Sequence, residues 1–379
     1  MKRILLVTSG YKHTLYNSLI DYPPNGMRFD YNKKDLDAGI EYAHKKSFIA
    51  RVTKTKIPFL PLNYYKNYFI RNFNDNDYDY LFTSGFIPFT NKKWISDCEH
   101  VGQYTGYSNF NLSVYKNQIK KYILKDNCKA IFSWTQKGVD TFHNYFNDKK
   151  IDDKVHFLPI TQKCLDINRN YNKDNINFIF ISSINLPFDY KIKGGEIALE
   201  AFDRISNKYD NIKLYVRSSI PNHIKKKYIN NNKIIFIENI LSKQLYHDLL
   251  MDSDVLLFPA FHTPGVIFIE MMKYGIPIVT SSVWANEEIV KDGQNGKVIT
   301  HSVYEKLEDK NHLPLWNEYK RYYKERIINK LSKDYSKAIE QYIINTNIIE
   351  NHGKKGNDMF INGRYSLKNR NYILTEIDW

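Results

Sequence analysis

Cysteine and long apolar segments are both scarce in this chain of 379 residues. Its three cysteines, Cys98, Cys128 and Cys164, are an odd number and form no C-x-x-C pair. This pattern argues against a disulfide framework and against a zinc site, and it fits a reducing compartment. No run of about 18 apolar residues is present, so we expect no membrane-spanning helix. The short apolar run in the opening MKRILLVTSG is typical of a first β-strand rather than of a signal peptide.

Basic residues are in excess. The chain has 55 Lys and Arg against 41 Asp and Glu, which gives a net charge of +14. Such an excess favours acidic partners such as nucleotide phosphates, nucleic acid or an anionic membrane, although an ordinary lysine-rich surface has the same composition. No recognisable nucleic-acid-binding module is present, so no nucleic-acid partner is expected.

The second half of the chain repeats a strand–helix unit. Five short apolar runs predict strands at 177–183, 212–218, 233–238, 255–258 and 276–280. Segments with apolar residues at helical spacing, 193–209 and 241–254, lie between some of them. Short apolar runs separated by helices indicate a parallel sheet that is buried on both faces.

The first half is similar but less regular. Strands are predicted at 3–10, 78–86, 128–135 and 154–160, and long loops rich in Tyr and Asn, such as 11–31, separate them. Long loops in a compact domain are usually functional or mobile.

The length and the strand pattern predict two domains. The polar stretch 168–175 is the expected linker between a domain at 1–167 and a domain at 176–345. Two doubly wound domains joined in this way would form a cleft that faces the carboxyl ends of their strands. Residues 315–345 predict one long charged helix, and 351–358 predict a flexible break. The rest of the segment 346–379 would carry a final helix, 366–379, that crosses back to the first domain.

The segment 258–280 carries the clearest chemical signal. An apolar strand ends at Pro259, and a short helix begins near Gly265. The first amides of a helix have no internal partner, so this helix start predicts a binding site for an anion such as phosphate. Glu270, one and a half turns into the helix, could reach past the phosphates to a ribose diol. Alternatively, Glu270 simply faces solvent on an ordinary helix.

This region resembles a known family. Residues 252–299 are similar to the donor-binding region of retaining glycosyltransferases of family four, which have the GT-B fold. The matching positions are Asp254, Pro259, Gly265, Glu270, Gly275, Pro277, Glu288, Asn295 and Gly296, together with Lys193 and Gly194 upstream. The resemblance covers roughly 128–300 and the last helix. It implies an α/β protein of two Rossmann-like, doubly wound domains that face each other across a cleft, with the acceptor on the first domain and a nucleotide sugar on the second.

The resemblance also implies roles for individual residues. Glu270 would bind the ribose of a nucleotide diphosphate sugar, and the amides of Gly265 and Val266 would hold the diphosphate. Lys193 would neutralise that diphosphate, which is physically apt because a positive charge stabilises a leaving group that becomes more negative.

Some positions depart from the family pattern. His262 stands where the family usually has a glutamate that contacts hydroxyls of the donor sugar; a neutral histidine can still make a hydrogen bond there. The arginine that usually accompanies the lysine is missing, and Arg217 could supply that second charge or could be an ordinary loop arginine. Glu238 is a further expected donor-binding residue.

On the first domain, His100 is the expected counterpart of a histidine that often faces the donor sugar in similar enzymes, or else a structural histidine. Glu99 and His100 precede a probable strand. Gly10 and His13, in the loop after the first strand, are expected near the donor.

Two metal-like motifs are set aside. The segment 75–79 begins like a calcium loop, but Tyr80 and Phe86 occupy the positions of its glycine and final glutamate. Asp252 and Asp254 precede their strand, which is the wrong edge of a parallel sheet for a ligand. We therefore expect no metal site and no cofactor apart from a UDP- or GDP-linked donor substrate.

The sequence thus predicts a metal-independent hexosyltransferase that retains anomeric configuration and acts on a glycan, lipid-linked or protein acceptor. A nucleotide-sugar epimerase and a non-catalytic binder of sugar nucleotides or glycans are the alternatives. The expected location is the cytoplasm. Basic segments with aromatic or apolar residues, such as 64–72 and 116–125, would allow peripheral contact with an anionic membrane.

Overall fold

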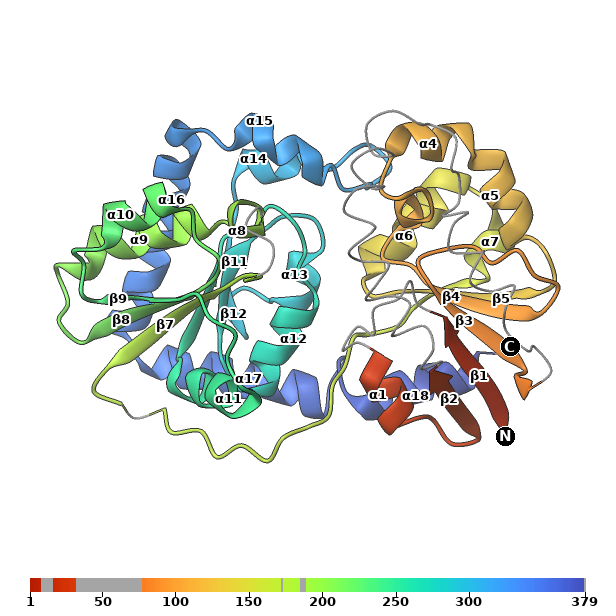
Figure 1. The fold of residues 1–379 in the computed structure, drawn as a ribbon, viewed down its shortest axis with the longest axis horizontal. Helices are drawn as coiled ribbons and strands as arrows, with labels where there is room; N and C mark the ends of the chain where they lie inside the picture. Colours follow the sequence, from red (N-terminus) through yellow and green to blue (C-terminus); the bar gives the residue numbers. More distant parts are fainter. Residues whose placement is uncertain (8–15, 32–76, 172, 185–188, 378–379) are drawn as a thin grey trace. The chain divides into compact units, whose positions relative to one another are not determined.

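The structure is a computed structural model that describes residues 1–7, 16–31, 77–171, 173–184 and 189–377. It divides into two compact units, each built around its own sheet (Figure 1). The first unit comprises Met1–Lys163, Asn311–Leu313 and Ser366–Trp379, and the second comprises Cys164–Lys310 and Pro314–Tyr365. Gly10, His13 and the basic segment 64–72 lie outside the described residues.

The first unit holds a sheet of six parallel strands in the order β2-β1-β3-β4-β5-β6. The strands are β1 (Lys2–Val7), β2 (Met27–Tyr31), β3 (Tyr80–Ser84), β4 (Lys93–Asp97), β5 (Cys128–Ser133) and β6 (Val155–Phe157). Because all six run in the same direction, their carboxyl ends share one edge of the sheet.

Helices cover both faces of this sheet (Figure 1). Leu5 and Val7 of β1 point to one face and Ile4 and Leu6 to the other, as the alternation of a strand requires. The first face packs against α5 (Lys116–Ile123) and α6 (Gln136–Phe146), with the shorter α4 (Asn109–Val114), α7 (Lys149–Asp152) and the 3-10 helix η4 (Val101–Thr105) beside them. The opposite face packs against α1 (Asn17–Asp21) and α18 (Leu367–Glu376).

The second unit holds a second six-stranded parallel sheet, in the order β12-β11-β10-β7-β8-β9. Its strands are β7 (Ile176–Ile181), β8 (Ile212–Arg217), β9 (Ile234–Ile237), β10 (Val255–Phe258), β11 (Ile278–Ser281) and β12 (Gly296–Ile299). The order reverses beside β7, so the ends of β7 and β10 form the switch point at which such sheets bind ligands.

Helices cover both faces of this sheet as well (Figure 1). One layer consists of α9 (Gly195–Ser206), α10 (Asn222–Tyr228) and α16 (Glu325–Ile344), and the other of α11 (Lys243–Asp252), α12 (Val266–Lys273) and α17 (Asn347–Ile361). The remaining helical segments are α8 (Asp189–Ile192), α13 (Asn286–Ile289), α14 (Ser302–Glu305), η5 (Trp316–Glu318) and α15 (Tyr319–Tyr322).

The nine strands predicted from apolar runs are confirmed, but three others were not expected. The segment 11–31, expected as a loop, contains α1 and β2. The strand expected after His100 was wrong: β4 precedes His100, and the 3-10 helix η4 follows it. The sequence also gave no prediction of β12.

Two helix predictions near the carboxyl end were wrong. The single helix expected at 315–345 is η5, α15 and α16, because Tyr323 and Lys324 leave helical geometry between α15 and α16. The break expected at 351–358 lies inside the continuous helix α17. Its glycines serve packing instead, since a Cβ on Gly353 would lie 2.3 Å from the carbonyl oxygen of Gly275.

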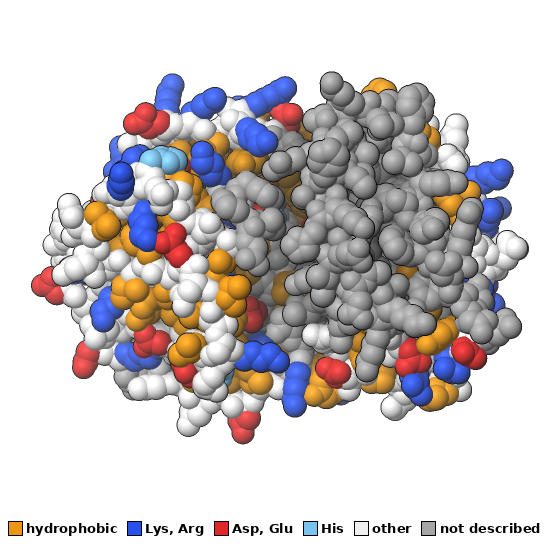
Figure 2. All heavy atoms as spheres, in the orientation of Figure 1, with side chains coloured by type: hydrophobic (Ala, Val, Ile, Leu, Met, Phe, Trp, Pro, Cys, Tyr) orange, Lys and Arg blue, Asp and Glu red, His pale blue; other side chains and the backbone are white. Residues whose placement is uncertain are grey.

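Among the residues that the structure describes, no helix is long and apolar enough to cross a membrane. Lysine and arginine side chains are scattered over the described surface that Figure 2 shows and do not gather in one patch. The excess of positive charge is therefore spread over the visible surface.

Candidate functional site

The site begins at the amino end of α12. After β10 ends at Phe258, the chain turns through Pro259 to Gly265, which has a φ of 40° and precedes the first helical residue, Val266. No side chain caps this helix start. The first amides of α12 are therefore left without a partner from the helix or from a capping side chain, and they carry the positive end of its dipole.

A second turn, between α8 and α9, packs directly against this loop. The amide of Phe261 donates to the carbonyl of Ile192 at 2.8 Å. Gly194 has a φ of 77°, and a Cβ there would lie 2.0 Å from the carbonyl oxygen of Pro259. Only glycine allows this approach, which places Lys193 beside the loop that leads to α12.

The charge of Lys193 acts on His262 across this contact. The pKa of His262 is lowered to about 3, mainly by burial and further by the positive charge of Lys193. The His262 ring packs edge-on against Trp316 with centroids 5.9 Å apart. Its Nε2 is buried and has no hydrogen-bond partner in the part of the chain that the structure describes. His262 is thus a neutral imidazole that can make a hydrogen bond to a ligand.

Lys193 has an anionic neighbour of its own. Its Nζ lies 3.2 Å from Oδ2 of Asp189, one turn earlier, and about a fifth of each side chain is exposed. The ammonium is therefore held in place but not sealed off from a ligand. A diphosphate would compete with Asp189 for it.

Glu270 lies farther along α12, with its carboxylate against α11. The hydroxyl of Tyr246 donates to Oε2 of Glu270 at 2.9 Å. Burial raises the pKa of Glu270, while the hydrogen bond from Tyr246 and the charges of Lys273 and Arg217 lower it. The guanidinium of Arg217, at the end of β8, lies 5.1 Å from the centre of the Tyr246 ring. The structure thus brings Arg217 close to Glu270, as a donor site would require.

Glu238 does not join this group. It follows β9, is exposed, and forms an ion pair with Lys225 of α10. Its carboxylate is thus paired with Lys225 rather than with Lys193.

Several positions of the recognisable motif have structural roles. Asp254 is buried at the amino end of β10, where it accepts from the amide of Asn177 at 2.8 Å and pairs with Arg169 and Lys173. Asn295 closes a turn through the amide of Lys291 and the carbonyl of Ile289. As predicted, Asp254 precedes its strand and lies at the edge opposite to the carboxyl ends of the strands.

The first unit holds its own polar cluster at the carboxyl end of β4. His100 is buried, and its Nδ1 accepts from the amide of Gly102 at 3.2 Å. Burial lowers the pKa of His100 to about 3. The imidazole is therefore neutral, and since Nδ1 accepts, its proton lies on Nε2. His100 can donate a hydrogen bond but cannot act as a cation.

Tyr107 closes over this cluster. Its hydroxyl donates to Oε2 of Glu99 at 3.0 Å, and its ring centroid lies 5.3 Å from that of His100. Burial raises the pKa of Glu99 to about 7, against a lowering by the Tyr107 hydrogen bond. Tyr107 has a φ of 66°, a left-handed conformation that is uncommon for a residue other than glycine. Glu99 is thus a carboxyl group that exchanges a proton near neutral pH.

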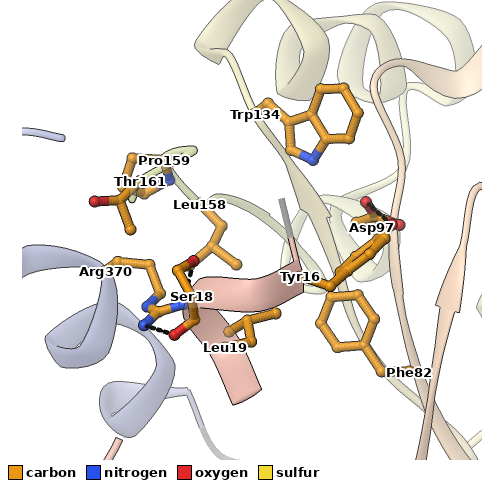
Figure 3. Close-up of a pocket in the computed structure, with 10 residues that line it drawn as sticks. All are labelled: Tyr16, Ser18, Leu19, Phe82, Asp97, Trp134, Leu158, Pro159, Thr161 and Arg370. Carbon is orange, nitrogen blue, oxygen red and sulfur yellow. Dashed lines mark hydrogen bonds between the residues drawn. The ribbon is translucent and has the colours of Figure 1, made fainter. Parts of the chain in front are cut away.

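A pocket lies near the same edge of the sheet (Figure 3). It encloses about 320 Å³, part of it open to solvent. Tyr16 donates to Oδ2 of Asp97 at 2.7 Å on one side, and the guanidinium of Arg370 contacts Ser18 on the other. Trp134, Phe82 and Leu158 supply much of the wall between these polar ends.

The sequence did not single out Tyr246, Tyr107 or Asp97. Each of them is an ordinary residue of a helix, turn or strand until the fold places its side chain against a charged neighbour. Tyr107 and Glu99 are only eight residues apart, so a contact between them could have been suspected from the sequence. The contact between Tyr246 and Glu270 joins two different helices, α11 and α12, and no local pattern predicts it.

Comparison with known proteins supports a link to sugar transfer. Residues 175–310, which lie in the second unit, match the family described as "Glycosyl transferases group 1". An uncharacterized 41.2 kDa protein of the cps region of Klebsiella pneumoniae is 24% identical over 188 residues, which are 48% of this chain and 48% of that protein. The match therefore spans about half the length of this curated relative.

Two solved structures are similar over nearly the whole chain. HepE of Anabaena, solved with UDP-glucose, has a TM-score of 0.61 at 12% identity and covers 99% of this chain and 98% of its own. A glycosyltransferase of Rickettsia africae has a TM-score of 0.61 at 13% identity, and the similarity covers 99% of this chain and 97% of that protein. These similarities show the fold.

The chain has the GT-B fold. Its two units, each with a six-stranded parallel sheet and helices on both faces, are the two Rossmann-like domains of that architecture. The family match of the second unit supports a glycosyltransferase of group 1.

Proposed function

We propose that the protein is a retaining glycosyltransferase of family four that moves a hexose from a UDP- or GDP-linked donor to an acceptor hydroxyl. One observation carries the proposal. The uncapped start of α12, the ammonium of Lys193 and the neutral imidazole of His262 meet at the switch point of the second sheet. Free amides and a lysine are the groups that bind a diphosphate.

The donor would lie along α12. Its diphosphate would meet the amides of Gly265 and Val266 and the ammonium of Lys193, and its ribose diol would donate to Glu270. The sugar would then lie near His262, whose Nε2 has no partner among the described residues. Arg217 would add positive charge beside Glu270. We assign Glu238 no role at the diphosphate, because Lys225 already pairs with it.

The chemistry follows from these charges. The bond between the anomeric carbon and the diphosphate oxygen breaks while the acceptor oxygen forms a bond on the same face. The acceptor proton passes to an oxygen of the leaving diphosphate. Lys193 and the α12 amides stabilise the negative charge that gathers on that leaving group. This scheme needs no metal ion, and turnover in the presence of EDTA tests that part of the proposal.

The acceptor would bind the first unit, at the carboxyl ends of β4, β5 and β6. His100 would act in this unit as a neutral hydrogen-bond donor through Nε2. The aromatic side chains of the pocket in Figure 3 and the carboxylate of Asp97 suit a hydroxylated ring, which stacks on aromatic faces and donates to carboxylates. The acceptor would be a glycan, which can be free, lipid-linked or attached to a protein.

Peripheral contact with a cytoplasmic membrane face would bring a lipid-linked acceptor within reach. Phe110 and Val114 lie four residues apart on α4 and are 68% and 57% exposed. The following helix, α5, carries Lys116, Lys120 and Lys121. Exposed apolar residues beside a basic helix favour an anionic interface.

Nuclear magnetic resonance of the reaction mixture tests the proposed activity. The protein is incubated with UDP- and GDP-sugars, with and without candidate glycans, and followed by phosphorus and proton spectra. The proposal predicts release of nucleoside diphosphate and a new glycosidic bond of the donor's anomeric configuration. An epimerised nucleotide sugar without release would indicate an epimerase, and binding without turnover would indicate a non-catalytic sugar-nucleotide binder.

A further inference from the structure

The two oxygens of the Glu270 carboxylate differ in their surroundings. Oε2 accepts the hydroxyl of Tyr246 at 2.9 Å. Oε1 accepts no hydrogen bond from any described residue and keeps some contact with solvent. One oxygen is therefore held by the protein, and the other is available to the hydroxyl groups of a ligand.

Tyr246 is itself held from two sides. It lies in the first turn of α11, whose start is capped by Ser242, which accepts from the amide of Leu245 at 3.2 Å. The guanidinium of Arg217 lies over its ring, 5.1 Å from the ring centre. The guanidinium and the face of the ring attract each other, and this attraction favours one position of the ring.

Tyr246 contacts two opposite charges, the carboxylate of Glu270 through its hydroxyl and the guanidinium of Arg217 over its ring. Arg217 forms no ion pair with Glu270 within the described parts of the chain, and its Nε is buried without a hydrogen-bond partner there. Tyr246 thus contacts both Oε2 of Glu270 and the guanidinium of Arg217, while Oε1 stays accessible.

Among the residues that the structure describes, four charged or titratable groups face the Glu270 carboxylate. Tyr246 comes from α11, Arg217 from β8 and Lys273 from the same helix as Glu270, and Tyr274 follows that helix. Burial raises the pKa of Glu270, and the hydrogen bond from Tyr246 is the largest opposing influence, ahead of Lys273 and Arg217. Loss of this hydrogen bond would make Glu270 easier to protonate.

We propose that Tyr246 is a positioning residue that turns Oε1 of Glu270 toward the ribose diol of the donor and keeps the carboxylate ionised. The inference rests on the proposed function, because it assumes that Glu270 binds ribose. A protonated Glu270 would present a donor where the diol needs an acceptor. Tyr246 thus sets the lowest pH at which the donor binds.

The test is calorimetric titration of Tyr246→Phe with UDP-glucose and with GDP-glucose, from about pH 5 to about pH 9. The diphosphate of a nucleotide sugar has no proton to lose in this range, and the loss of a base proton near about pH 9 affects the wild type and the variant alike, so the difference between them reports on the protein. At about pH 9 the variant should bind within about twofold of the wild type. At about pH 6 it should bind at least about fivefold more weakly, because the acid limit of binding has moved to higher pH.

Tyr274→Phe is the matched control. It removes a hydroxyl from a neighbouring tyrosine whose oxygen contacts Nδ1 of His247 at 2.9 Å rather than the carboxylate. It should leave the acid limit within about half a pH unit of the wild type. In the Glu270→Gln background, Tyr246→Phe should weaken nucleotide-sugar binding by less than about a further twofold, because the carboxylate through which Tyr246 acts is gone.

The outcomes separate this proposal from the proposed function. If Tyr246→Phe weakens binding by the same factor at every pH, the claim that Tyr246 keeps the carboxylate ionised is wrong. If the variant does not weaken binding at all, the whole positioning role is wrong. The donor site stands in both cases. If the wild type binds neither nucleotide sugar at any pH, the proposed function is wrong and the role of Tyr246 falls with it.

Discussion

The amide of Phe261 donates to the carbonyl of Ile192 at 2.8 Å, and this bond joins the two segments of the candidate donor site. Lys193 follows one of these residues and His262 the other, so the bond fixes the ammonium beside the imidazole. The two segments are about 70 residues apart in sequence and meet because β7 and β10 are neighbours in the sheet. The contact is a property of the fold, and the chemistry of the site depends on it.

Gly194→Ala tests the contact between these segments. The new Cβ would lie 2.0 Å from the carbonyl oxygen of Pro259, at a residue whose φ is 77°. Gly293 is a matched control, because its φ is 70° but no atom lies within 4 Å of a Cβ built there. Urea unfolding should show that Gly194→Ala costs about 1–3 kcal/mol more than Gly293→Ala, and nucleotide affinity should fall in the first variant alone. Equal costs would mean that the approach of the two turns has been misplaced.

Lys193→Ala should slow sugar transfer about 100-fold, because the charge of Lys193 acts on the leaving diphosphate. For the same reason, it should weaken the binding of nucleoside diphosphates more than the binding of nucleoside monophosphates. Lys191→Ala is the control, because the Lys191 ammonium lies over the ring of Tyr323, 5.9 Å from its centre. Steady-state kinetics and calorimetry measure both effects. Equal losses for monophosphates and diphosphates would remove the reason for placing Lys193 at the diphosphate.

Glu270→Gln should separate binding from stability. Nucleotide affinity should fall at least about tenfold, because an amide accepts fewer hydroxyl protons than a carboxylate. Burial raises the pKa of Glu270, so the folded state holds its proton more tightly than the unfolded state does. The free energy of unfolding that protonated Glu270 contributes is therefore lost as the pH rises above 4.5, the ordinary pKa of a glutamate. At neutral pH, the Glu270→Gln variant should melt at the same temperature as the wild type or at a higher one. A variant that binds as well as the wild type would refute the ribose assignment.

His262 should stay neutral throughout the physiological range. Burial and Lys193 lower its pKa to about 3, whereas the unfolded chain takes up a proton near 6.5. Acid therefore favours the unfolded state, and stability from this group is lost as pH falls from about 6.5 toward about 3. His262→Asn should make the melting temperature less sensitive to acid in that window. An imidazole resonance of His262 that titrates between pH 6 and pH 7 would contradict this account.

Membrane contact predicts a salt-dependent association with vesicles. The protein should sediment with vesicles that contain phosphatidylserine and should be released as salt rises, because screening weakens the attraction of lysines for anionic headgroups. Phe110→Ser with Val114→Ser should reduce binding severalfold, since both side chains are largely exposed. Ile240→Ser, an exposed apolar residue of the second unit, serves as the control. Absence of binding at low salt would favour a soluble glycan or protein acceptor.

The sequence predicts the regular core of this fold well. Runs such as 178–181 and 255–258 are continuously apolar because their strands are covered on both faces, and such runs are easily recognised. β4 was missed because its five residues, KWISD, include two that are buried and polar, Ser96 and Asp97. α17 was mistaken for a break because its glycines are read as loop formers, although they allow close packing.

The candidate site was only partly predictable. The helix start at Gly265, Lys193 and Glu270 are recognisable from local pattern, and the structure places Lys193 beside the loop that leads to this helix. The roles of Tyr246 and Tyr107 depend on contacts made after folding, which no short pattern encodes. Glu238 looked suitable by its position after β9, yet the structure pairs it with Lys225.

Thermal denaturation with nucleotides tests the central claim most directly, because a ligand that binds only the folded state raises the melting temperature. The account predicts that UDP or GDP raises the melting temperature, that the corresponding nucleoside does so far less, and that Lys193→Ala removes most of the difference. If no nucleoside diphosphate raises the melting temperature more than its nucleoside does, the donor site proposed at α12 is contradicted.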